Sequence, residues 1–167
     1  MPTSTTYNAT RLTYDSRYDF GQTRARFDEQ VPLLDPSVAL ELVVAGAPWD
    51  EVEKAITPKQ GPTGLVALAR LDQGALLSLS GQPMEATLYL VGNPLIARQV
   101  IGDRAAGSLY APFRVAVFGD QAGAHVAYDQ PSSVFASLGS SAIDQIAADL
   151  DGKVKVAAEA ACGGVTR

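Results

Sequence analysis

Two alternating apolar segments, residues 113–118 and 124–129, are joined by only five residues that begin and end with glycine. A link this short between two strand-like segments predicts a β-hairpin. It has no room for the crossover helix that parallel neighbouring strands require, which argues against a doubly wound parallel sheet. This hairpin is therefore the feature that most limits what the chain can form, and it favours an antiparallel sheet.

The segments around the hairpin follow helical or strand periodicity in turn. Capping residues, prolines and spacing predict a strand at 11–15, helices at 19–31, 35–45 and 48–57, strands at 65–72 and 86–92, a short helix at 93–101 and a long helix at 141–162. In the second of these helices, Leu40, Val43 and Val44 are expected to face the core. The stretch 73–97 reads as buried strands and turns, because glycines and prolines interrupt it.

This order predicts an α+β protein: a strand, helices, four strands with a short helix after the Gly-Asn-Pro turn, and a final helix, with the helices packed on a curved antiparallel sheet. A length of 167 residues suits one domain covering 1–167. Within it, we expect flexible tails at 1–10 and 163–167 and an extra helical region at 31–60.

Composition excludes several function classes. A net charge of −5 argues against nucleic-acid partners and against binding to an anionic membrane. The single cysteine, Cys162, and the single histidine, His125, cannot form an internal disulfide or a multi-histidine metal site, so we expect neither a metal nor another cofactor. The polar N-terminus lacks the pattern of a secretory signal, which favours a cytoplasmic protein.

No nucleotide-binding, hydrolase or zinc-protease motif occurs, so candidate site residues rest on local chemistry. Asp72 ends a strand, where a carboxylate could bind a ligand or act as a base, or could simply cap a turn. Asn93 precedes Pro94 and could present free amides to an anion, or only cap the helix. Arg114 lies in an apolar strand; if it points inward it needs a carboxylate, and Asp72 is the obvious partner for a ligand clamp or a structural ion pair.

The remaining candidates have plainer interpretations. Tyr89, Tyr110 and Tyr128 could form the polar rim of a pocket, although core packing is the safer interpretation for each. His125 lies at the edge of the hairpin and is interpreted as a surface histidine, since no nucleophile pattern adjoins it. Cys162 ends the last helix without a basic neighbour, so it is interpreted as an incidental thiol.

Four short signatures occur in this order: LDQGALL at 71–77, GNPLIA at 92–97, LYAPFRV at 109–115 and YDQPSS at 128–133. They resemble the family numbered 302 among the domains of unknown function, and the similarity extends from about 14 to 160. The resemblance implies a TATA-binding-protein-like strand, helix, four-strand, helix fold and a tendency to form homodimers. It implies no nucleic-acid binding, because fold does not determine function.

The chain departs from this family at Gln73, where many relatives have histidine, so a proton-transfer or metal role is not expected there. Our first hypothesis is a homodimeric small-molecule-binding protein whose apolar pocket is oriented by ligand-binding residues Asp72, Gln73, Asn93, Tyr110, Arg114 and Tyr128. The alternative is a cofactor-independent lyase or isomerase, with Asp72 as base, a tyrosine such as Tyr128 as acid, and Arg114 stabilising negative charge. A third possibility is an interaction protein without a pocket.

Overall fold

The computed structural model describes residues 1–164. Its strands are β1 (Arg11–Asp15), β2 (Val66–Asp72), β3 (Ala86–Gly92), β4 (Phe113–Asp120) and β5 (Gly123–Asp129). Its helices are α1 (Phe20–Gln30), α2 (Pro36–Ala45), α3 (Trp49–Ile56), α4 (Gln73–Leu77), α5 (Pro94–Asp103), α6 (Pro131–Phe135) and α7 (Ser141–Cys162). Short 3₁₀ turns cover Thr57–Lys59 (η1), Ser78–Ser80 (η2), Ala105–Leu109 (η3) and Ala136–Leu138 (η4).

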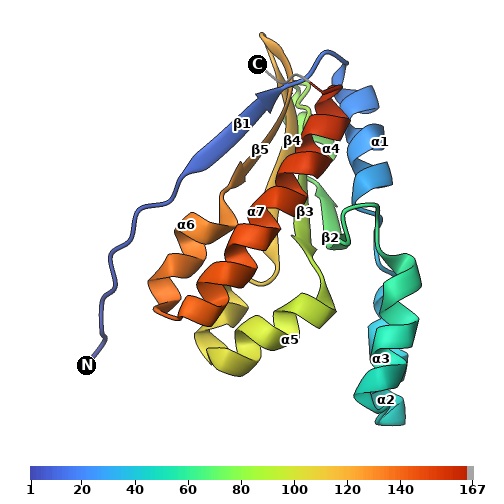
Figure 1. Cartoon of the computed structure of the whole chain (residues 1–167). Coiled ribbons are helices and arrows are strands. Elements are labelled where there is room, and N and C mark those ends of the chain that lie inside the picture. Colours follow the sequence, from blue (N-terminus) through green and yellow to red (C-terminus); the bar gives the residue numbers. More distant parts are fainter. Residues whose placement is uncertain (165–167) are drawn as a thin grey trace.

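The five strands form one antiparallel sheet in the order β1-β5-β4-β3-β2, which confirms the predicted α+β class (Figure 1). The hairpin of β4 and β5 is also confirmed, with Asp120 paired to Gly123 across a turn of only Gln121 and Ala122. Gly123 has a φ of 135°, a conformation that glycine adopts without the steric cost that a Cβ imposes. The N-terminal strand β1 pairs with β5, so the first and last strands of the chain are neighbours at one edge of the sheet.

Helices α1 and α7 lie side by side across one face of the sheet (Figure 1). Strand alternation sends one set of side chains into this layer, and all are buried: Tyr89, Val91, Val115, Val117, Val126 and Tyr128. Helix α7 contributes Ile143, Ala147, Leu150 and Val154 from one helical face. The two-layer core therefore lies on this side, and no helix layer formed by residues 1–164 covers the opposite face of the sheet.

Helices α2 and α3 project beyond the sheet as a separate pair (Figure 1). Asp35 caps α2 by accepting a hydrogen bond from the Ser37 amide, as the sequence predicts. The expected inward orientation of Leu40, Val43 and Val44 is wrong, because these side chains are 63–79% exposed. The small core under α2 and α3 is built instead on Leu34, Ile56 and Val66, so this face of α2 has no neighbour within the described chain.

The stretch after β2 also differs from the sequence interpretation. Residues 73–77 form helix α4, which begins where Asp72 accepts a hydrogen bond from the Ala75 amide. Leu76, Leu77 and Leu79 are exposed, so the expectation of buried strands and turns is wrong there. Helix α5 is confirmed, with Asn93 as its cap.

The long C-terminal helix is confirmed, and Ser140 caps it by accepting a hydrogen bond from the Ile143 amide. Gly163 ends the helix in the left-handed conformation. The predicted tail at 163–167 lies mostly outside the described residues, whereas residues 1–10 are described and contain no helix or strand. Among the helices of residues 1–164, none combines the length and apolar character needed to cross a membrane.

Candidate functional site

A cavity of about 510 Å³ opens at the end of the sheet where β3, β4 and β5 meet η3 and α6. Its volume lies within the range of roughly 300–1,000 Å³ that is typical of small-molecule sites. The wall is formed by Tyr7, Ala9, Leu90, Leu109, Tyr110, Pro112, Phe113, Arg114, Asp129, Pro131, Val134 and Phe135. Most of these side chains are apolar or aromatic, which favours a ligand with an apolar body.

Aromatic side chains hold the inner wall of the cavity. Phe135 is buried and its ring stacks on Tyr110, with ring centroids 5.8 Å apart. The Tyr110 hydroxyl accepts a hydrogen bond of 3.0 Å from the Ser137 hydroxyl. Phe113 is also buried at the start of β4. Because packing and hydrogen bonding fix these rings, the cavity is largely formed before any ligand arrives.

The charged side chains of the wall are Arg114 and Asp129, and their surroundings differ. Asp129 is already paired, because Arg11 donates to both of its carboxylate oxygens at 2.8 and 3.1 Å. The exposed Arg114 guanidinium makes no ion pair or hydrogen bond with any part of the chain from 1 to 164. The cavity therefore presents one cation without a partner beside one neutralised carboxylate.

The N-terminal segment forms the outer wall of the cavity. The Thr10 amide donates to the Ser133 hydroxyl at 2.9 Å, and the Thr10 carbonyl accepts from the Gln130 amide at 2.7 Å. These bonds place Tyr7 edge-on against Tyr110, with ring centroids 6.2 Å apart. The interaction with Tyr110 raises the pKa of the Tyr7 phenol, so the Tyr7 hydroxyl stays protonated near neutral pH and can donate a hydrogen bond.

Two predicted ligand-binding residues, Asp72 and Gln73, lie at the junction of β2 and α4, outside the cavity wall. Asp72 accepts from the Ala75 amide at 3.0 Å, and Arg24 approaches its carboxylate at 3.4 Å. Asp72 thus performs the capping role that was the simpler interpretation. Gln73 is exposed at the first position of α4.

The suggested pairing of Asp72 with Arg114 is wrong, because the two residues lie on opposite faces of the sheet. Asp72 is aligned with Thr87, whose side chain is buried on the helix-covered side. Arg114 is aligned with Leu90, which belongs to the other set of alternating positions. The lyase or isomerase mechanism needs Asp72 and Arg114 to converge, and this arrangement does not provide that.

The other predicted residues divide between the cavity and the core. Tyr110 and Arg114 line the cavity. Tyr128 is buried under the helices, 3.3 Å from the Tyr14 hydroxyl, and burial raises the pKa of its phenol. Asn93 caps α5 and donates to the Gly64 carbonyl at 2.8 Å, so its amide is used internally. The separate hollow beside Asn93 measures only about 20 Å³, room for about one water molecule.

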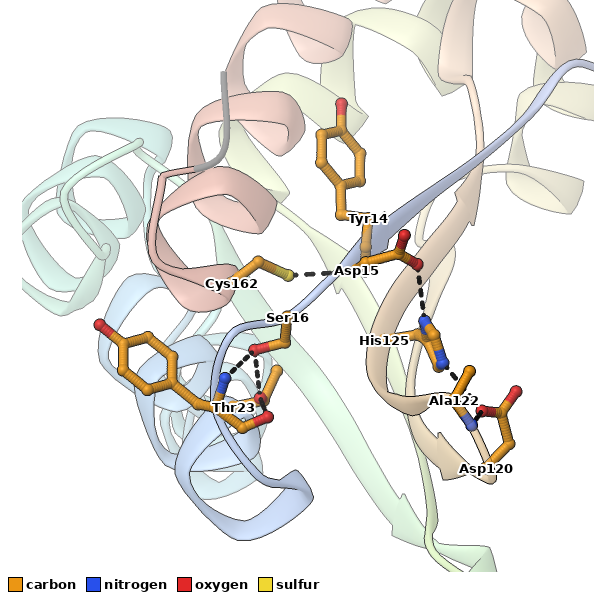
Figure 2. Close-up of polar contacts among 9 residues, drawn as sticks. Tyr14, Asp15, Ser16, Thr23, Asp120, Ala122, His125 and Cys162 are labelled. Atoms are coloured by element: carbon orange, nitrogen blue, oxygen red, sulfur yellow. Dashed lines mark hydrogen bonds and ion pairs between the residues drawn. The ribbon is translucent and has the colours of Figure 1, made fainter. Parts of the chain in front are cut away.

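The only histidine is clamped between two aspartates at the far end of the sheet (Figure 2). His125 Nδ1 lies 3.0 Å from Asp15, and Nε2 lies 3.0 Å from Asp120, which also accepts from the Ala122 amide. Burial lowers the pKa of His125, but the two carboxylates outweigh it and raise the pKa above its ordinary value. The prediction of a surface histidine is wrong, because His125 is only 7% exposed.

Near this histidine, Cys162 is buried and its thiol lies 3.7 Å from the Tyr14 carbonyl (Figure 2). Burial raises the pKa of Cys162 to about 11, which leaves the thiol protonated and unreactive at neutral pH. Across residues 1–164, no group of three or more histidine, cysteine or acidic side chains is placed to hold a metal ion.

The sequence profile of the family described as "Domain of unknown function DUF302" matches residues 40–161. The chain belongs to the DUF302 family. A similar fold occurs in the crystal structure of an uncharacterized conserved DUF302 protein from Bacillus stearothermophilus, with a TM-score of 0.64 and 16% identity over 91% of this chain and 97% of that one. Among curated proteins, no sequence match is found. The resemblance drawn from the four signatures is thereby confirmed.

Sequence reasoning missed several cavity residues, including Tyr7, Leu90 and Asp129. A signal for the site was nevertheless present in the DUF302 signatures. The segments 109–115 and 128–133 lie far apart along the chain, yet together they supply most of the cavity wall. Their pairing through the β4–β5 hairpin could have been used to place both segments at one end of the sheet.

Proposed function

We propose that this DUF302 protein binds a small molecule in the cavity between β4, α6 and the N-terminal segment. The observation that carries the proposal is the preformed, aromatic-lined volume of about 510 Å³ with few polar groups. Such a combination is the usual design of a ligand site, in which apolar contact supplies affinity and a few polar groups set orientation. A catalytic role gains no comparable support, because the proposed acid–base groups lie apart.

The direct test fills the cavity and measures binding of the neutral dye N-phenyl-1-naphthylamine by fluorescence. Val134→Trp adds an indole to the cavity wall, and we expect it to weaken dye binding at least tenfold. Val156→Trp is the matched control, because Val156 is 53% exposed on α7 and lies outside this cavity. Equal dye affinity in both variants would contradict the proposal.

The proposal includes a homodimer formed through the uncovered face of the sheet. Strand register places an apolar row straight across this face: Ala127, Ala116, Leu88 and Leu71 on β5, β4, β3 and β2. Leu71 is 48% exposed, and an apolar sheet face of this kind is stabilised by packing against a second sheet. A second copy of the chain would supply that sheet.

Native mass spectrometry tests the dimer. We expect twice the chain mass for the unchanged protein and a monomer for Leu88→Lys, because two lysines would be buried at the centre of the interface. Val156→Lys, on the solvent side of α7, should remain dimeric. A monomeric unchanged protein at micromolar concentration would contradict this part of the proposal.

A further inference from the structure

The charges at the cavity define the class of ligand more narrowly than its volume does. Arg114 and Asp129 both line the wall, but Arg11 occupies both carboxylate oxygens of Asp129. The pair Arg11–Asp129 is therefore electrically neutral. The Arg114 guanidinium has no such partner in the described chain, so one positive charge of the wall is uncompensated.

The positions around Arg114 favour an anion that also has an apolar portion. Its neighbour across the β3–β4 pair is Leu90, and the wall continues through Phe113 and Phe135. The guanidinium donates charge-assisted hydrogen bonds to an anion, and this wall supplies apolar contact beside it. The Tyr7 and Tyr110 phenols add donor groups to the same cavity.

We infer that the cavity binds a small monoanion, with its carboxylate on Arg114 and its apolar body between Leu90 and the aromatic rings. This inference rests on the proposed ligand-binding function and specifies its ligand class. A single guanidinium balances one negative charge and matches a carboxylate in a two-bond geometry. A dianionic phosphate would bring a second charge that nothing else in the wall neutralises.

The test uses four naphthalene probes that share one ring system and differ in head group: 1-naphthoate, 1-naphthylmethanol, 1-naphthylmethylamine and 1-naphthyl phosphate. Isothermal titration calorimetry measures each affinity at pH 7 and low salt. We expect 1-naphthoate to bind tightest and the cationic amine weakest, with a difference of at least tenfold between them. Tighter binding of 1-naphthyl phosphate than of 1-naphthoate would overturn the monoanion assignment.

Two variants test whether Arg114 causes this order of probe affinities. Arg114→Gln should weaken 1-naphthoate binding about tenfold or more and leave 1-naphthylmethanol within about twofold, because only the anion loses a charge-assisted bond. Arg24→Gln removes the same charge on the helix-covered side beside Asp72 and should change neither affinity. This control separates a local contact from an effect of net charge.

The outcomes distinguish the inference from the function on which it rests. If 1-naphthylmethanol and 1-naphthoate bind with equal affinity, or if Arg114→Gln affects both equally, the anion preference is refuted while ligand binding stands. If none of the four probes binds, the proposed function fails and the inference fails with it. Unchanged 1-naphthoate affinity in Val134→Trp would place the binding elsewhere and also overturn the inference.

Discussion

Gly152 lies in the middle of the longest helix, and replacing it with alanine gives a sharp test of the packing described above. A glycine inside a helix is expected to mark a kink or a close contact. Helix α7 is nevertheless continuous from Ser141 to Cys162, and a Cβ built at Gly152 meets no atom within 4 Å. Gly152 is also exposed. Gly152→Ala should therefore stabilise the protein.

The magnitude follows from helix propensity, because no tertiary contact opposes it. Alanine is favoured over glycine by about 0.5–1 kcal/mol inside a helix, chiefly through the lower conformational entropy of the unfolded chain. For a domain of this size, that free energy corresponds to a rise in Tm of roughly 1–4 °C. Urea unfolding followed by circular dichroism measures it directly, with an unchanged slope against denaturant.

Gly61→Ala is the matched comparison, because it makes the same chemical change where space is absent. A Cβ at Gly61 would collide with the Gln30 carbonyl and lie 2.7 Å from the Pro32 ring. We expect this variant to be destabilised by more than about 2 kcal/mol. A destabilised Gly152→Ala, or a neutral Gly61→Ala, would refute the packing that underlies these predictions.

Three further predictions test the polar groups. Because the aspartate contacts raise the pKa of His125, they should stabilise the folded protein fully below about pH 6.5, and this stabilisation should be lost as pH rises through the folded-state pKa. His125→Gln should therefore flatten the pH dependence of the free energy of unfolding, measured with urea between about pH 5.5 and 8.5. The same pH dependence in the variant and the unchanged protein would contradict this prediction. Tyr89→Phe removes the 2.9 Å hydrogen bond to Asp28 and should lower the free energy of unfolding by about 1 kcal/mol. An unchanged free energy of unfolding would contradict a stabilising role for this bond. Tyr7→Ala should weaken N-phenyl-1-naphthylamine binding several-fold without changing the free energy of unfolding. Unchanged dye affinity would mean that the N-terminal segment does not contribute to the ligand site.

Local signals in the sequence were sufficient for most of the fold. The short link between β4 and β5 forced an antiparallel pair, and Asp35 and Asn93 with their following prolines marked two helix starts. Alternation also predicted strand β3 with its observed bounds. In each of these cases, neighbours within a few residues along the chain determine the structure.

The errors arose where distant contacts decide the outcome. Leu40, Val43 and Val44 have the periodicity of a buried face, but α2 projects from the sheet and nothing in the described chain covers them. Periodicity identifies an apolar face and not what lies against it. His125 was misplaced for a similar reason, since Asp15 reaches it only through the pairing of β1 with β5.

The candidate site was predicted only in part. Tyr110 and Arg114 line the cavity, whereas Asp72 lies on the other face of the sheet. A β-bulge at Leu68 shifts the alternation within β2, so the sequence pattern alone does not show on which face of the sheet each residue of that strand lies. The contribution of Tyr7 depends on bonds between Thr10 and the start of α6, which local patterns do not encode.

The central claim is that the cavity at the end of the sheet is the ligand site, and amide chemical-shift mapping by NMR during titration with 1-naphthoate tests it most directly. We predict that the largest shifts cluster at Arg114, Val134 and Phe135 and in the segment containing Ala9, and that they saturate together. The strongest competing surface is the exposed apolar face of α2. Shifts confined to Leu40 and Val43, or scattered and unsaturated across the protein, would contradict the account.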